Sequence, residues 1–296
     1  MRTKPRDRDK RQREDAEPKA RRLLILSTGA GNITPETEAR LRELFADHLV
    51  IQFDPKVDFE NFITPRARVV IAGGDGSVAF VVRKLADSRH PVGILSLGTF
   101  NNFALALGLP PDLDQQIEVV KKGRPRPFTV GRVNGTVFLE ACLIGLFGET
   151  IAFGESLKDR KYGTVMSDLA KLLAAKRFAY ELDGDLDGSG TAMSLVFTNT
   201  SSIGSRLPVG GSTPKDHHLE FAILAGRTRT DIAARALASA FLMRHSEEGV
   251  GQVIRFKRAS VRTKPLVSVY ADNVLVGRTP ATITAEVSAV MVILPR

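Results

Sequence analysis

The chain has little cysteine and no long hydrophobic run. A single cysteine, Cys142, excludes an intrachain disulfide and a cysteine-based metal cluster, and its apolar neighbours predict a buried thiol. The apolar stretch at 138–147 is interrupted by Glu140 and is too short to span a bilayer, which needs about 20 apolar residues. The amino terminus also lacks the apolar segment of a secretory signal. We therefore expect a cytoplasmic protein without a transmembrane segment.

The chain also lacks a nucleic-acid-binding signature, although it carries a net charge of +9. Neither a zinc module nor an aromatic RNA-binding motif accompanies the basic residues, so we expect no specific nucleic acid partner. More than half of the charge lies in residues 1–22, which have ten basic and five acidic side chains. Because this segment has almost no apolar residues, it is predicted to be a disordered tail. The tail either attaches the protein to the inner membrane surface or only improves solubility.

A glycine-rich turn follows an apolar run at 68–72. It consists of Gly73, Gly74, Asp75, Gly76 and Ser77. The three glycines let the backbone bend and approach a ligand closely. If the apolar segment after the turn is a helix, its first N–H groups and positive dipole favour an anion such as a nucleotide phosphate. The carboxylate can hold Mg²⁺ or accept a proton, whereas the alternative without chemistry is a tight Asp-Gly hairpin turn.

A second turn of the same kind follows the apolar run at 91–97. It contains Gly98, Thr99, Asn101 and Asn102, and either asparagine can cap a helix that ends near Gly108. Two successive strand-turn-helix units predict a parallel sheet. Both turns then lie at the carboxyl ends of their strands, where open α/β sheets bind ligands. The pair of turns therefore indicates a nucleotide site.

The two turns resemble those of the diacylglycerol kinase catalytic domain family, which includes bacterial lipid kinases and sphingosine kinases and is related to the NAD kinases. The chain has GGDGS at 73–77 and PVGILSLGTFNNFALALGLP at 91–110. The family pattern is approximately GGDGT and P-x-G-x-x-P-x-G-T-x-N-D-F-A-R-x-L-G-I-P. Weaker similarities extend over most of residues 22–296. The resemblance implies transfer of the γ-phosphoryl group from ATP, with Mg²⁺, to a lipid hydroxyl of the diacylglycerol type at a membrane surface.

The resemblance also implies two domains with a cleft between them. Residues 23–125 are expected to form an α/β nucleotide-binding domain with a Rossmann-like parallel sheet, and residues 126–296 a mainly antiparallel, β-rich lipid or substrate domain. Pro125 and Pro127 mark the boundary. Periodicity predicts helices at 34–48, 112–122, 162–176 and 229–244, and short strands in the second domain.

The matched motifs place the expected site residues in the cleft. Asp75 and Asp272 are the expected catalytic acids, and Asp75 also binds Mg²⁺, through water or directly. The nucleotide-contacting set is Thr28, Gly29, Gly73, Gly74, Gly76, Ser77, Gly98, Thr99, Asn101 and Asn102.

Two other acidic groups are weaker candidates for metal binding. Asp216 is retained from an Asp-Asp-Gly that is associated with a structural metal in some family members. The run Asp183, Asp185 and Asp187 lacks the distal glutamate of a calcium-binding EF-hand loop, and its glycines predict a hairpin turn.

Three positions depart from the family pattern. The turn at 27–32 lacks the Asn-Pro that usually ends the first strand. Asn102 replaces an aspartate, and an amide neither neutralises a metal nor takes a proton. Val274 replaces a glutamate that is the proposed general base in some members.

The sequence leaves three functions open. The first is an active lipid kinase that uses Asp75 as base or recruits another acid such as Glu140 or Glu149. The second is a nucleotide- or lipid-binding relative with little or no catalysis. The third is a kinase of a soluble hydroxyl compound. The sequence specifies neither the acceptor nor the oligomeric state.

Overall fold

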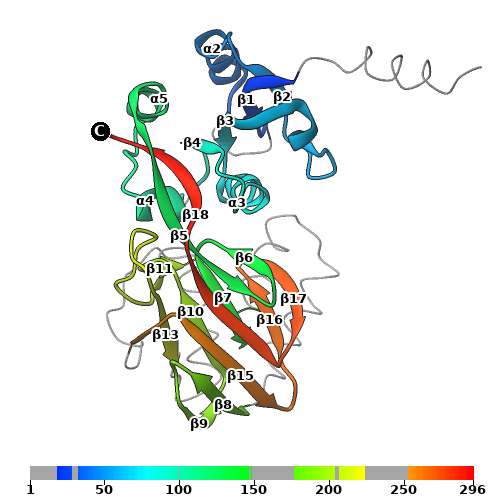
Figure 1. Ribbon diagram of the computed structural model, residues 1–296, viewed down its shortest axis with the longest axis vertical. Coiled ribbons are helices and arrows are strands. Elements are labelled where there is room, and N and C mark those ends of the chain that lie inside the picture. Colours follow the sequence, from blue (N-terminus) through cyan, green and yellow to red (C-terminus); the bar gives the residue numbers. More distant parts are fainter. Residues whose placement is uncertain are drawn as a thin grey trace, which may run out of the picture.

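The computed structural model describes residues 19–28, 33–99, 101–146, 148, 177–203, 207–223 and 253–296. These residues form an α/β half, drawn from blue through cyan to green at the top of Figure 1, and a mainly antiparallel β half below it. This arrangement confirms the predicted fold class. Gly29, Glu149 and the helices predicted at 162–176 and 229–244 lie outside the described residues.

The α/β half is built on a parallel sheet. Its elements are β1 (Ala20–Leu26), α2 (Pro35–Leu44), β2 (Leu49–Gln52), the short 3-10 helix η1 (Phe59–Phe62), β3 (Ile63–Gly73), α3 (Asp75–Lys84), β4 (Pro91–Ser96), α4 (Asn102–Ala106) and α5 (Leu113–Lys122). The strands lie in the order β2-β1-β3-β4, and each neighbouring pair is parallel, as predicted. β1 begins within the segment predicted to be disordered, because the backbone of Ala20 and Arg22 pairs with β3. Residues 20–22 are therefore part of a strand rather than of the predicted disordered tail.

Helices cover both faces of this sheet. The apolar run of β1 alternates between the two faces, so Leu23 and Ile25 belong to one core cluster and Leu24 and Leu26 to another. The first cluster includes apolar residues of α3, and the second includes apolar residues of α2 and α5. A continuous apolar strand buried on both faces is what a parallel sheet requires.

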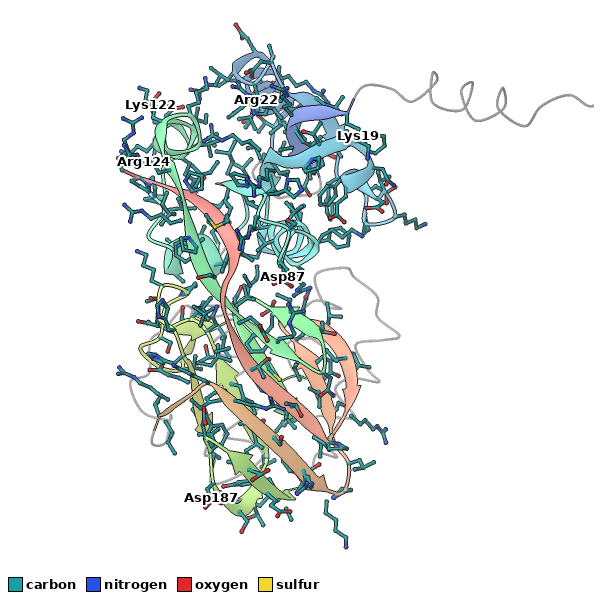
Figure 2. The ribbon with its side chains drawn as sticks, viewed as in Figure 1. Lys19, Arg22, Asp87, Lys122, Arg124 and Asp187 are labelled. Carbon is teal, nitrogen blue, oxygen red and sulfur yellow. The ribbon has the colours of Figure 1, made fainter. Side chains whose placement is uncertain are left out.

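The β half contains the remaining strands. They are β5 (Arg124–Val133), β6 (Thr136–Phe138), β7 (Ala141–Gly145), β8 (Phe178–Gly184), β9 (Gly188–Ala192), β10 (Ser194–Thr198), β11 (Ser202–Ile203), β12 (Leu207–Pro208), β13 (Leu219–Ile223), β14 (Ile254–Phe256), β15 (Arg258–Lys264), β16 (Ser268–Ala271), β17 (Val274–Arg278) and β18 (Ala281–Leu294). One sheet has the order β14-β13-β10-β7-β16-β17, and its apolar residues share a core with those of β8 and β15 in the other sheet. β8 and β9 form the predicted hairpin, with Asp187 at the far end of the molecule (Figure 2).

The strand β18 joins the two halves. Its first residues pair with β15, whereas Met291 and Val292 pair with β4 of the parallel sheet. β5 pairs with β18 on both sides of an irregularity between Glu286 and Val290. Figure 1 shows these two strands running together from one half into the other. A single ten-stranded sheet therefore crosses the predicted domain boundary.

Burial makes the thiol of Cys142 unreactive. The side chain lies on β7 within the core of the β half and is 0% exposed. Desolvation raises the pKa of this thiol, and the charge of Asp272 adds to the effect. Because the thiolate is the reactive form, modification by a disulfide reagent at pH 8 should be about a hundredfold slower in the folded protein than in urea. Equal rates would contradict the buried placement.

Candidate functional site

The ends of three parallel strands meet at one edge of the sheet. After β1, the backbone N–H of Ser27 donates to the carbonyl of Ala72 at 2.9 Å. After β4, the N–H of Leu97 donates to the carbonyl of Gly73 at 2.8 Å. The turns that follow β1, β3 and β4 are thus fixed next to one another.

Two of these turns touch through their glycines. A Cβ at Gly98 would lie 2.8 Å from the Cα of Gly74, and one at Gly73 would lie 2.2 Å from Oγ of Ser77. A Cβ at Gly76, in contrast, would have nothing within 4 Å. The first two glycines are therefore needed for packing, whereas Gly76 faces open space at the amino-terminal end of α3. The hydroxyl of Ser77 donates to the carbonyl of Gly74 at 3.0 Å and braces the turn.

Asn101 connects Asp75 to the second turn. Its backbone N–H donates to Oδ2 of Asp75 at 2.8 Å. Its side-chain Oδ1 accepts the N–H of Gly98 at 2.9 Å, and its Nδ2 donates to the carbonyl of Gly98 at 3.0 Å. Asn101 has a φ of 53°, in the left-handed region that asparagine tolerates better than most residues. The carboxylate of Asp75, half-buried at the start of α3, is thereby held in place.

A buried glutamine on α5 supports the same turn. Oε1 of Gln116 accepts the N–H of Ser96 at 2.7 Å, while its Nε2 donates to Oγ of Ser96 and to the carbonyl of Pro110. Gln116 is 1% exposed, so these bonds satisfy a polar group that would otherwise be costly to bury. Sequence patterns did not indicate this residue, because a glutamine within a helix is usually a surface residue.

Asn102, which follows Asn101 in the second turn, connects the α/β half with the β half. Nδ2 of the buried Asn102 donates to Oε2 of Glu140 at 3.1 Å. Glu140 lies between β6 and β7, and its own side chain is only partly buried. Asp75 and Glu140 therefore contact neighbouring residues of the same dipeptide, 101–102. The structure brings together two carboxylates that are 65 positions apart in the chain.

Asp272 makes a second connection between the halves. Its carboxylate accepts the backbone N–H groups of Leu139, Glu140 and Ala141 at 3.0, 2.8 and 3.0 Å. Arg83, in the last turn of α3, donates to Oδ2 of Asp272 at 2.6 Å. All four of these bonds end on the carboxylate of one residue, which fixes Glu140 relative to α3. Figure 1 shows α3 directly above β6, consistent with this connection.

Asn199 holds the same segment from its other side. This 0% exposed residue follows β10 and donates through Nδ2 to the carbonyls of Thr129 and Leu139. Its backbone N–H donates to the carbonyl of Glu140 at 2.8 Å. The backbone of Glu140 is therefore held through its N–H by Asp272 and through its carbonyl by Asn199.

Asp216 lies in a tight turn of its own. Its Oδ2 accepts the backbone N–H and the hydroxyl of Thr213 at 2.8 and 3.0 Å. Burial by itself would raise the pKa of Asp216, but these hydrogen bonds lower it below its usual value. Within the described residues, no group of three or more His, Cys, Asp or Glu side chains is arranged to hold a metal ion.

Comparison with known proteins shows which family the region that carries these turns is similar to. Residues 25–133 match the family model of the diacylglycerol kinase catalytic domain. The match extends from β1 to the end of β5 and leaves most of the β half outside it. A Staphylococcus haemolyticus protein provisionally named a lipid kinase is 27% identical over 258 residues, 82% of each chain. The diacylglycerol kinase of Bacillus subtilis is 33% identical over 148 residues, which cover 46% of this chain and 47% of that protein.

Solved structures show the same fold over nearly the whole chain. A diacylglycerol kinase from Bacillus anthracis has a TM-score of 0.68 at 20% identity and covers 92% of this chain and 96% of its own. A yeast NADH kinase, solved with NADH, has a TM-score of 0.55 at 13% identity and covers 93% and 83%. The α/β half and the β half thus form the two-domain fold expected from the resemblance.

The structure groups most of the predicted site residues at the turns of the α/β half. Gly73, Gly74, Asp75, Gly76, Ser77, Gly98, Asn101 and Asn102 meet at the turns described above, and the exposed Thr28 and Thr99 lie in the turns after β1 and β4. Asp272 binds the backbone of Glu140 and the side chain of Arg83, and Asp216 is placed on the loop before β13. Arg83 was not predicted, because a basic residue in a last helical turn usually faces solvent. Among the described residues, no helix is long and apolar enough to cross a membrane.

The Asp272 carboxylate should dominate the stability of the contact between the halves. Asp272→Ala leaves three backbone N–H groups and the largely buried Arg83 without their acceptor, so we expect a loss of about 3–5 kcal/mol in the free energy of unfolding. Urea unfolding measures this loss. The matched control is Asp187→Ala at the exposed hairpin tip, which should change stability by less than about 0.5 kcal/mol. Similar values for both variants would show that the connection contributes little.

Proposed function

We propose that the protein is an ATP- and Mg²⁺-dependent lipid kinase that transfers the γ-phosphoryl group to the hydroxyl of a diacylglycerol-like acceptor. The observation that carries this proposal is the open space at Gly76, at the amino-terminal end of α3, beside a carboxylate fixed by Asn101. The match of residues 25–133 to the family model of the diacylglycerol kinase catalytic domain supports the reaction class.

The amino-terminal end of α3 suits the phosphates of ATP. A helix leaves its first N–H groups without partners inside the helix, and its dipole adds positive potential there. With no Cβ at Gly76, a phosphate oxygen can approach the backbone directly. Phosphoryl transfer depends mainly on such positioning and on neutralisation of charge, rather than on covalent chemistry by the protein.

The carboxylate of Asp75 fits a hard cation. One of its oxygens accepts the N–H of Asn101, and this hydrogen bond fixes the orientation of the carboxylate at the start of α3. Oxygen ligands are what Mg²⁺ prefers, and one or two carboxylates with water usually suffice when phosphates supply the rest. When bound, Mg²⁺ neutralises charge on the phosphates. Asp75 would hold the ion and thereby set where the phosphates lie.

Glu140 is our candidate for the general base. Asn102 replaces the family aspartate, but its amide donates to the carboxylate of Glu140, so an acid is still present against this position. Asn102 orients one oxygen of Glu140, and the backbone on either side of Glu140 is fixed by Asp272 and Asn199. The acceptor hydroxyl would lose its proton to this carboxylate as its oxygen attacks the γ-phosphorus.

Asp272 has a positioning role in this proposal. A carboxylate that already accepts three backbone N–H groups and an arginine has little capacity left to take a proton from substrate. Its contribution is to keep the segment at 139–141 next to α3 (Figure 1). In this proposal Glu140, and not the expected Asp272, is the catalytic carboxylate.

Glu140→Gln tests the base. Glutamine keeps an oxygen that accepts from Asn102 but cannot take a proton, so kcat should fall by about 10² to 10⁴ while the Kd for ATP stays unchanged. Transfer of labelled γ-phosphate to diacylglycerol in mixed micelles gives kcat, and calorimetry gives the Kd. Asp75→Asn serves as the contrast, because it should weaken binding of Mg-ATP itself.

Three outcomes would count against these assignments. Full activity of Glu140→Gln with an inactive Asp75→Asn would move the base to Asp75. Turnover of a soluble hydroxyl compound without micelles would contradict a lipid acceptor. ATP binding without any turnover by the unmodified protein would contradict the kinase.

Gly76→Ala separates ligand binding from folding. The new Cβ meets no atom of the protein, and alanine is favoured over glycine in a helix by about 0.5–1 kcal/mol, so stability should be kept. The methyl group would stand where a phosphate approaches, and the Kd for ATP should rise about tenfold or more. The comparison is Gly98→Ala, whose Cβ would lie 2.8 Å from the Cα of Gly74 and should lower the melting temperature. Unchanged ATP binding by Gly76→Ala would remove this turn from the nucleotide site.

A further inference from the structure

A cavity at the opposite end of α4 is separate from the candidate phosphate site. It has a volume of about 520 Å³ and lies where the end of α4, the start of β5, the end of β18 and the loop before β13 come together. Its lining residues are Leu107, Gly108, Arg126, Pro127, Phe128, Lys215, Leu294 and Pro295. This volume falls within the range of about 300–1,000 Å³ that is usual for small-molecule sites.

The cavity combines an apolar base with two cations. Leu107, Phe128 and Leu294 are buried, whereas Arg126 and Lys215 are exposed at its edge. No acidic side chain is among the lining residues. Among the residues that the structure describes, no ion pair holds either cation. Two unpaired cations beside an apolar surface match a ligand that has an anionic head and an apolar body.

The fold places the two cations rather than leaving them on a random surface. The carbonyl of Pro214 accepts the N–H of Thr129 at 2.9 Å, and this bond docks the loop that carries Lys215 against β5. At the end of α4, Gly108 has a φ of +74°, and a Cβ there would lie 3.4 Å from Nζ of Lys215. The side chain of Lys215 therefore lies directly over the helix end, beside the strand that carries Arg126.

Further positive charge surrounds the cavity. Arg124 is exposed two positions before Arg126, so both side chains lie on the same face of β5. Figure 2 shows Arg124 and Lys122 pointing away from the molecule beside the end of β18. Lys122 is paired with Glu118 on α5, so Arg124 is the side chain that adds to the charge of Arg126 and Lys215. Several exposed cations of this kind suit an anionic surface better than a single buried anion.

We propose that this cavity binds the phosphate headgroup of an anionic phospholipid in a membrane. Arg126 and Lys215 donate hydrogen bonds to the phosphate oxygens, and the glycerol carbons lie on the side chains of Leu107 and Phe128. α4 is five residues long, so at about 1.5 Å per residue the headgroup lies within about 8–10 Å of Asn102 along the helix. Such binding would hold the candidate phosphate site close to the lipid surface. The bound phospholipid is not the molecule that is phosphorylated.

Vesicle binding tests the proposal without any turnover, so its outcome does not depend on the proposed kinase activity. The full-length protein is sedimented with two kinds of vesicle, one of phosphatidylcholine alone and one of phosphatidylcholine with roughly one third phosphatidylglycerol, which is an anionic lipid. Each basic residue near such an anionic surface increases partitioning about fivefold. The test variant is Arg126→Gln with Lys215→Gln. The control is Lys264→Gln with Arg278→Gln, which removes the same charge from exposed positions in the β half.

We expect the test variant to bind the anionic vesicles about tenfold or more weakly than the unmodified protein, and the control variant to bind within about twofold of it. Equal losses in both variants would show a general charge effect and overturn the proposal, as would unchanged binding of the test variant. Calorimetric binding of millimolar inorganic phosphate by the unmodified protein, lost in the test variant and without any binding to vesicles, would show that the cavity takes free phosphate, which also overturns the proposal. Melting curves of both variants confirm that these exposed substitutions leave the fold intact.

Discussion

The carboxylate of Asp272 is the contact on which the relation between the halves depends. It collects three N–H groups from the segment before β7 and a guanidinium from α3. Such a group is stable in a partly buried position only while all of its partners stay in place, because a buried charge without partners is costly. The contact therefore favours one arrangement of the two sheets over any in which they slide or rotate. The contact of Asn102 with Glu140 occurs within that arrangement, which the pairing of β18 with β4 and β5 also supports.

The candidate site follows from ordinary features of a parallel sheet. Strands that run in the same direction end at the same edge, so their glycine turns come together without long loops. The glycines differ in purpose: Gly73 and Gly98 permit contact between turns, while Gly76 leaves space for a ligand. The β half then adds a carboxylate, Glu140, against an amide that replaces an acid. Asn102, in the α/β half, lacks a negative charge, and Glu140, in the β half, supplies one next to it.

The sequence predicted most of the α/β half because its signals are local. Apolar runs predicted the strands, hydrophobic periodicity predicted the helices at 34–48 and 112–122, and the glycine turns predicted the edge of the site. Arg83 and Gln116 could not be found in this way, because their partners are distant in the chain and their residue types are common on helix surfaces. The role of Glu140 depends on the folding of the segment between β6 and β7 against α4. Hydrophobic periodicity in the sequence does not reveal such a contact between distant segments. The pairing of β18 with β4 is equally non-local, so the predicted boundary missed the sheet shared by both halves.

The shared sheet has a consequence for how the chain is synthesised. β4, which leads into the second glycine turn, pairs with β3 on one side and with residues near position 291 on the other. A ribosome that has released the first 125 residues has delivered every predicted nucleotide contact but not the strand that closes this edge of the sheet. Until β18 emerges, β4 exposes unpaired backbone to water and to other nascent chains. The start of β4 is therefore paired on both sides only after residue 292 has emerged, although the residues of both glycine turns are made before position 125.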